Sequence, residues 1–128
     1  MTYRAQIPYG AYWSTPFARW QGSLANLNSV ELAAHVTKRE LEQRSIGADS
    51  FDYGVLGMTV PQHHSFYGLP WLMGMIGGAD VGGPTINQAC ATGTRTLLAA
   101  AQEIESGLAE SALVVTCDRT SNGPHIYY

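Results

Sequence analysis

The sequence predicts an α/β fold built on a mainly parallel sheet. Short apolar runs typical of strands alternate along the chain with segments that have the period of an amphipathic helix, and turn residues separate them. Strands that alternate with helices usually pair in parallel through right-handed crossovers. The expected strands cover residues 5–13, 53–60, 85–89 and 111–117, and the expected helices cover residues 29–44, 69–77 and 91–106.

The first strand and the first helix are expected in the N-terminal third of the chain. Apolar side chains alternate from Ile7 to Trp13, and Thr15-Pro16 ends this run. Asn28 is a suitable N-cap for the helix, because Glu31 completes a capping-box pattern three residues later. The buried side of this helix would carry Val30, Ala33, Val36 and Leu41.

The second strand and helix follow a similar pattern. The strand over residues 53–60 is rich in apolar residues and ends before Pro61. Pro70 suits the first turn of the next helix, and Gly77-Gly78 ends that helix.

The third strand, over residues 85–89, is followed at once by Cys90 and by the third helix. Gly107 is a good residue to end this helix. The last strand, over residues 111–117, is expected to be fully buried, and Cys117 within it is interpreted as a packing residue.

Cys90 is the candidate nucleophile of this chain. A strand that ends in cysteine and turns directly into a helix places the sulfur at the helix N-terminus, where free N–H groups and the helix dipole favour a thiolate. The residues after it, Ala91, Thr92 and Gly93, are small and leave space beside the sulfur. The arrangement is similar to the nucleophile elbow of hydrolases, with sulfur in place of oxygen.

Composition narrows the classes of function. The 128 residues suit one domain, and only 13% of them are charged, which suggests that much of the surface is covered by something else. The net charge of −3, without a basic cluster, does not indicate nucleic acid as a partner. Two cysteines do not make a secreted disulfide framework, and the longest apolar run, Leu69 to Ile76, is too short to span a bilayer. A cytoplasmic protein is expected.

Neither a metal nor a bound cofactor is expected. His63 and His64 are adjacent, but no third ligand lies at a suitable spacing. The glycine-rich residues 77–83 lack the pattern of a phosphate-binding loop.

Four segments resemble the thiolase family. Residues 87–93, Asn-Gln-Ala-Cys-Ala-Thr-Gly, are similar to the N-x-x-C-[AGS]-[ST]-G motif around its acyl-accepting cysteine. Thr15-Pro16-Phe17 resembles its opening segment, Ala101 to Val115 resembles its A-x-x-I-x-x-G-x-A-D pattern, and Ser121 to Pro124 resembles its S-N-A-P segment. The chain departs from the family at Ser14, where arginine is usual, at Asp118, where glutamate is usual, and over residues 59–80.

The resemblance implies that residues 1–128 form the N-terminal thiolase domain, a layered α-β-α unit that lacks the loop domain and the C-terminal domain. It implies acyl transfer between a 3-ketoacyl-CoA and coenzyme A through a Cys90 thioester, with the Cys90 N–H as an oxyanion donor. Coenzyme A is then a substrate. A homo-oligomer, a dimer or a tetramer with the cysteine helix near the two-fold axis, is also implied.

The family's G-H-P, C-x-G and N-E-x-F segments do not occur in this sequence. A longer polypeptide or a second chain would therefore supply them.

Two alternatives stay open. The β-ketoacyl synthases share this fold and have a similar cysteine segment, and two histidines without a C-x-G segment downstream would indicate a synthase. A non-catalytic thiolase-like subunit of a larger complex is the other alternative.

Overall fold

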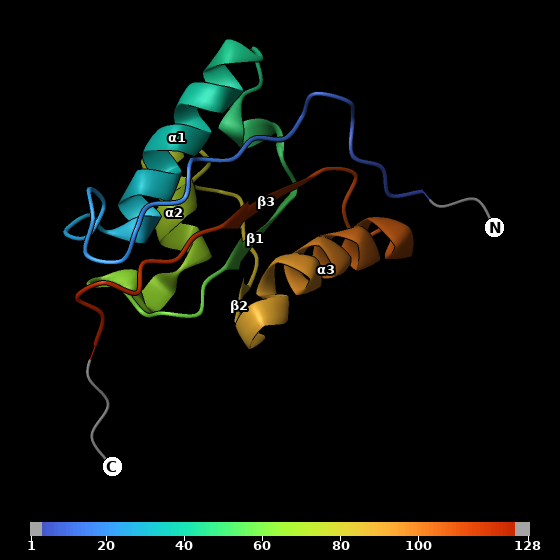
Figure 1. Cartoon of the computed structure of the whole chain (residues 1–128). Coiled ribbons are helices and arrows are strands. Elements are labelled where there is room, and N and C mark those ends of the chain that lie inside the picture. Colours follow the sequence, from blue (N-terminus) through green and yellow to red (C-terminus); the bar gives the residue numbers. More distant parts are fainter. Residues whose placement is uncertain (1–3, 125–128) are drawn as a thin grey trace.

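The three strands found within residues 4–124 form one parallel sheet in the order β2-β1-β3, which confirms the predicted α/β fold. The structure is a computed structural model and describes residues 4–124 (Figure 1). Short 3₁₀ turns lie between several of its elements. The helices and strands, in chain order, are α1 (Ser29–Gln43), β1 (Tyr53–Gly57), α2 (Leu69–Ile76), β2 (Thr85–Ile86), α3 (Thr92–Ser106) and β3 (Ala112–Thr116).

The sheet lies between two helical layers (Figure 1). On one face, α1 and α2 pack on each other and on the sheet, and Leu56, Leu113 and Val115 contribute to a shared apolar core with them. On the other face, α3 packs against β1 and β3. Val55 and Leu56 of the central strand are both fully buried, as expected for a strand that is covered on both faces.

The helix boundaries follow the local signals in the sequence. The Asn28 side chain caps α1 by accepting hydrogen bonds from the N–H groups of Val30 and Glu31. Pro70 lies in the first turn of α2. Gly107 ends α3 in the left-handed conformation, with φ of 78°. These three predictions are confirmed.

The predicted first strand is wrong, because residues 5–13 form no strand. A turn interrupts this segment, in which the Ala11 N–H donates to the Pro8 carbonyl at 3.0 Å and Gly10 has φ of +79°. Arg44, the C-cap residue of α1, then donates hydrogen bonds to the carbonyls of Gly10 and Tyr12. Residues 10–12 therefore lie beside the end of α1, whereas the N–H groups of Arg4 and Ala5 donate to Glu105 Oε1 of α3. The segment is an irregular strap and does not pair with the sheet.

The other strands are shorter than predicted. β1 ends at Gly57. The Met58 N–H still donates to the Ile86 carbonyl, and the Asp118 side chain then accepts from the N–H groups of Thr59 and Val60. β2 ends at Ile86, well before Cys90. β3 alternates between buried and partly exposed residues and ends at Thr116, so Cys117 follows the strand and is only partly buried.

Gly57 is the residue that lets α3 approach the sheet. A Cβ atom at this position would lie 2.9 Å from Thr92 Cγ2 and 2.8 Å from Thr96 Cγ2. Contacts this short are not tolerated without movement of the helix. Glycine inside a strand often marks such a close approach of another element.

We expect Gly57→Ala to destabilise the protein by about 1–3 kcal/mol, the usual cost of overpacking a close-packed interior. Gly74→Ala is the matched control, because a Cβ at this position of α2 meets nothing within 4 Å. The control should raise stability by roughly 0.5–1 kcal/mol through helix propensity. Thermal unfolding of both variants in the full-length polypeptide checks this, and a Gly57→Ala protein as stable as wild type would contradict the packing described for α3.

Candidate active site

Cys90 lies where the chain passes from the carboxyl end of β2 to α3. It occupies the middle of a short 3₁₀ turn, Ala89–Ala91, and Ala91 is the N-cap of α3. Its side chain is exposed. The structure therefore puts the thiol at the edge of the sheet where α/β folds place their sites, immediately before the N-terminus of a helix, as the sequence predicts.

The backbone around Cys90 is tightly hydrogen-bonded. The Ala89 N–H donates to Asn87 Oδ1 at 3.0 Å, and the Ala91 N–H donates to the Gln88 carbonyl at 3.0 Å. The Gln88 N–H donates to Thr92 Oγ1 at 2.8 Å. Within residues 4–124 the Cys90 N–H has no such partner. The Cys90 N–H therefore takes no part in the hydrogen bonds that shape the turn.

Ala89 gives the turn its shape. Its φ is +46°, in the left-handed region that residues other than glycine rarely adopt. Backbone conformations of this kind persist when surrounding contacts hold them, and they occur often at functional sites. Here the strained residue is the one directly before the candidate nucleophile.

Cys117, the other thiol, has a different environment. It follows β3 and packs against the apolar core. Burial raises its pKa to about 11, and the negative charge of Asp118 acts in the same direction. At pH 8 Cys117 is therefore mostly the neutral thiol, whereas the thiolate is the reactive form of cysteine.

We expect limited treatment of the folded protein with iodoacetamide at pH 8 to label Cys90 well before Cys117. Cys90 is exposed, whereas burial keeps Cys117 protonated. Raising the pH toward 11 should increase labelling of Cys117, since its raised pKa leaves it uncharged below that range. Peptide mapping by mass spectrometry measures both sites. Faster labelling of Cys117 at pH 8 would contradict this assignment.

Within residues 4–124, no hydrogen bond joins a histidine side chain to Cys90. His35 lies on α1, and the rings of His63 and His64 have centroids 3.9 Å apart and are tilted by 56°. His125 lies outside the described residues. Residues 4–124 contain no group of three or more His, Cys, Asp or Glu placed to hold a metal ion. Over the same range, no helix is both long enough and apolar enough to cross a membrane.

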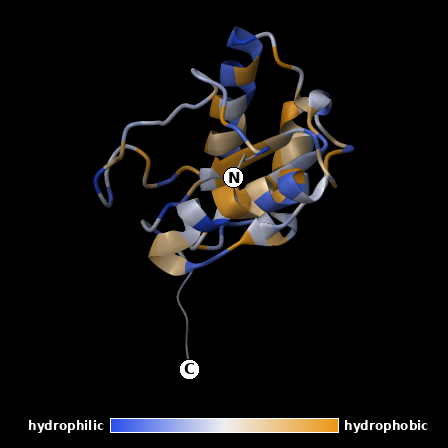
Figure 2. Cartoon of the chain, turned by 90° about the vertical axis from the view of Figure 1, so that its right-hand side faces the viewer, coloured by the Kyte–Doolittle hydropathy of each residue, from blue (hydrophilic) through white to orange (hydrophobic). Residues whose placement is uncertain are grey.

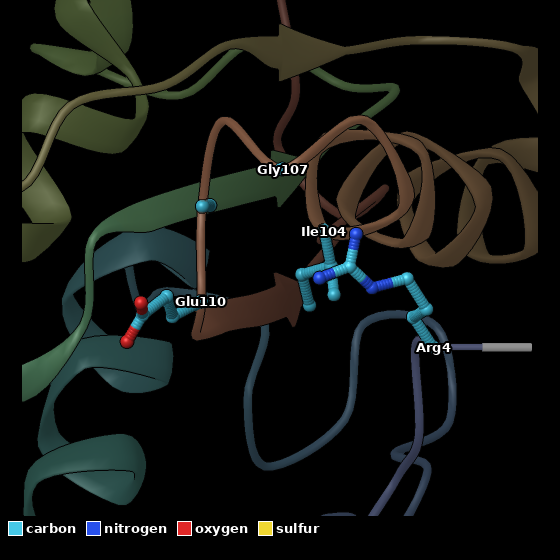
Figure 3. Close-up of a pocket in the computed structure, with 5 residues that line it drawn as sticks. Arg4, Ile104, Gly107 and Glu110 are labelled. Atoms are coloured by element: carbon cyan, nitrogen blue, oxygen red, sulfur yellow. The ribbon is translucent and has the colours of Figure 1, made fainter.

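Two hollows on the surface of residues 4–124 lie along α3, and they differ in their distance from its cysteine end. One, at the far end of the helix, is lined by Arg4, Ile104, Gly107, Ala109 and Glu110 (Figure 3). Arg4 lies beside Ile104 there, and Glu110 points away. Since α3 has 15 residues, this hollow is about 20 Å from the Cys90 turn. It has no thiol, so it is no candidate for the same chemistry.

Comparison with known protein families shows which family this chain belongs to. Residues 11–128 match the family described as thiolase, N-terminal domain. The chain belongs to the thiolase family. An acetyl-CoA acetyltransferase of Paracoccus denitrificans is 30% identical over 123 residues, which cover 89% of this chain and 29% of the relative. The chain therefore spans less than a third of the length of this thiolase relative.

Solved structures agree on the thiolase fold. The acetyl-CoA acetyltransferase of Bacillus anthracis superposes with a TM-score of 0.71 at 24% identity, over 85% of this chain and 28% of that one. The 3-oxoacyl-[acyl-carrier-protein] synthase III of Aquifex aeolicus VF5 superposes with a TM-score of 0.68 at 21% identity, over 75% of this chain and 31% of that one. At these identities the likeness establishes the fold alone.

Two features of this thiolase site were missed in the sequence. The side chain of Thr92 bonds to the turn that carries Cys90, and Gly57 gives α3 room against β1. A signal existed for each. Thr92 lies two residues after the cysteine, where a hydroxyl can reach back to the preceding turn. Gly57 is one of two glycines in the apolar run over residues 53–60 that the sequence predicts as a strand.

Proposed function

We propose that this chain is the nucleophile-bearing part of a thiolase-type acyl-CoA C-acyltransferase. The observation that carries the proposal is the exposed thiol of Cys90, held in a turn between β2 and α3 of a thiolase-family domain. Coenzyme A is a substrate in this proposal, and no bound cofactor is needed. The covalent intermediate divides one difficult transfer into two easier steps.

In the first step, the Cys90 thiolate attacks the 3-keto carbon of a 3-ketoacyl-CoA. The bond between C2 and C3 breaks, its electron pair leaves with the acetyl-CoA fragment, and an acid protonates that carbanion. The shortened acyl group stays on Cys90 as a thioester. In the second step, the thiol of coenzyme A loses its proton to a base and attacks the thioester, which releases an acyl-CoA and the Cys90 thiolate. Run in reverse, the steps give a Claisen condensation.

The chain provides only part of this chemistry. The thiol and the Cys90 N–H come from the described turn, whereas the acid and the base of the reaction are expected from the G-H-P and C-x-G segments typical of thiolases. The proposal therefore concerns the polypeptide or the complex that contains both parts. Its location in the cytoplasm stays a prediction, which fractionation of cells expressing the tagged full-length protein checks.

An uncovered face beside α3 supports the proposal that another chain segment or subunit packs on this domain. β3 is an edge strand, with only β1 as its neighbour in the described sheet. Beside it lies an apolar groove, and Figure 2 views this side of the molecule and shows hydrophobic segments at its centre. The residues lining the groove are Ala5, Gln6, Ile7, Thr94, Leu97, Leu98, Ala100, Ala101, Ile104, Ala112 and Val114.

Leu97 and Leu98 of this groove are exposed, and so is Leu108 just beyond the end of α3. Exposed apolar patches of this kind are typical of surfaces that another chain segment or subunit covers. We propose that the remainder of the thiolase fold, in the same polypeptide or in a second chain, covers this groove, and that the assembled protein is a dimer or a tetramer.

Acetoacetyl-CoA cleavage by the full-length polypeptide tests the function. We expect loss of the substrate's absorbance only when coenzyme A is present, with acetyl-CoA as the product. A β-ketoacyl synthase stays an alternative, because the Aquifex synthase III shares this fold. A synthase would instead consume malonyl-thioester and release carbon dioxide. Inactivity in both assays would favour the non-catalytic thiolase-like subunit and contradict the proposal.

A further inference from the structure

One side chain at the start of α3 joins both residues that precede Cys90. Thr92 Oγ1 accepts a hydrogen bond from the Gln88 N–H at 2.8 Å and donates one to the Ala89 carbonyl at 2.7 Å. The Thr92 N–H also donates to the Ala89 carbonyl. The Thr92 hydroxyl therefore links the start of α3 to Gln88 and Ala89, the two residues before Cys90.

The bridge acts on the strained part of the backbone. Ala89 has φ of +46°, and its carbonyl receives two of the three hydrogen bonds that Thr92 makes. Without them, the turn could relax toward ordinary φ values and rotate the following peptide. That peptide carries the Cys90 N–H, and Cys90 itself follows directly.

Packing fixes the Thr92 side chain in turn. Thr92 is only 6% exposed, and a Cβ atom built on Gly57 would lie 2.9 Å from its Cγ2 methyl group. Since the methyl group lies against the central strand, the χ1 angle is fixed and the hydroxyl is directed at the turn. Through Thr92, the position of the turn is therefore fixed relative to β1, the most buried strand of the sheet.

We propose that Thr92 is a positioning residue for Cys90, whose hydroxyl holds the thiol and the Cys90 N–H in the relative orientation that acyl transfer needs. The kinetic part of this inference rests on the proposed thiolase function. Its geometric part concerns the reactivity of Cys90 and can be measured without any turnover.

The test compares Thr92→Val with Thr92→Ser in the full-length polypeptide. Valine keeps the shape of threonine but has no hydroxyl, and serine keeps the hydroxyl. We expect Thr92→Val to lower kcat by about tenfold or more, as small misplacements of reacting groups do, while KM changes by no more than about twofold. Thr92→Ser should restore kcat to within about threefold of wild type, because the hydroxyl restores the alignment.

Thr96→Val is the matched control. Thr96 is fully buried on the same face of α3, its methyl group also meets Gly57, and its Oγ1 donates to the Gly93 carbonyl at 2.7 Å, away from the Gln88–Ala89 backbone. The Thr96→Val variant should lose stability as Thr92→Val does but keep the kcat of wild type.

A second readout is the rate at which iodoacetamide alkylates Cys90 at fixed pH. This rate should change about fivefold or more in Thr92→Val and stay within about twofold in Thr96→Val.

Equal effects of Thr92→Val and Thr96→Val on kcat and on Cys90 alkylation would overturn the inference, since both would then act through stability. Loss of kcat in Thr92→Ser as large as in Thr92→Val would also overturn it. If the wild-type protein has no thiolase turnover but the alkylation rates differ as stated, the proposed function fails and the positioning of Cys90 by Thr92 holds.

Discussion

Replacing Cys90 by alanine should lower kcat/KM for acetoacetyl-CoA cleavage by at least about 10³-fold in the full-length protein, because no thioester can form without the thiol. The fold should not change. Cys90 is exposed in a 3₁₀ turn, and the hydrogen bonds of that turn come from the backbone and from Asn87 and Thr92. Steady-state kinetics and thermal unfolding of the variant measure the two effects.

Cys117→Ala is the matched control for this experiment. It also removes a thiol, but one that packs against the core and whose pKa is raised to about 11. We expect turnover within about threefold of wild type and a stability loss of about 1 kcal/mol from the small cavity. Full turnover by Cys90→Ala, or abolished turnover in a folded Cys117→Ala protein, would contradict the assignment of the nucleophile.

Residues 1–128 expressed as an isolated polypeptide should have no measurable thiolase turnover. Acid, base and nucleophile act as one unit, and loss of any member commonly costs about 10⁴-fold or more in kcat. The exposed groove between α3 and β3 should also make the fragment dimerise or aggregate. An acetoacetyl-CoA cleavage assay and size-exclusion chromatography measure these properties.

The control is the same assay after the downstream residues are restored, either in one polypeptide or as a second subunit. Activity should then appear together with a defined oligomer. Robust turnover by a monomeric fragment of residues 1–128 would show that the family's division of catalytic residues does not apply to this chain.

Local signals in the sequence predicted the helices well, since each rests on contacts between near neighbours. Asn28 caps α1 through the N–H groups of Val30 and Glu31, and Gly107 takes the left-handed conformation that ends α3. The position of Cys90 was predictable for the same reason. The helix that begins at Thr92 places the sulfur at its N-terminus, although β2 ends at Ile86 and a 3₁₀ turn separates it from α3.

What the sequence did not reveal depends on contacts between distant residues. Alternation from Ile7 to Trp13 is typical of a strand, but a strand needs a partner edge, and Arg44 instead holds the carbonyls of Gly10 and Tyr12 beside α1. Just after β1, the Thr59 N–H likewise donates to the Asp118 side chain, which is 59 positions away. Such pairings have no signature in either segment by itself.

Direct detection of the acyl-enzyme tests the central claim, that Cys90 accepts the acyl group. The full-length protein is mixed with acetoacetyl-CoA without free coenzyme A, quenched in acid and digested, and the peptides are mapped by mass spectrometry. We predict an acetyl group on the peptide that contains Cys90, and its loss when coenzyme A is added before the quench. Product formation without acylation of Cys90, or acylation of Cys117 instead, would contradict the account.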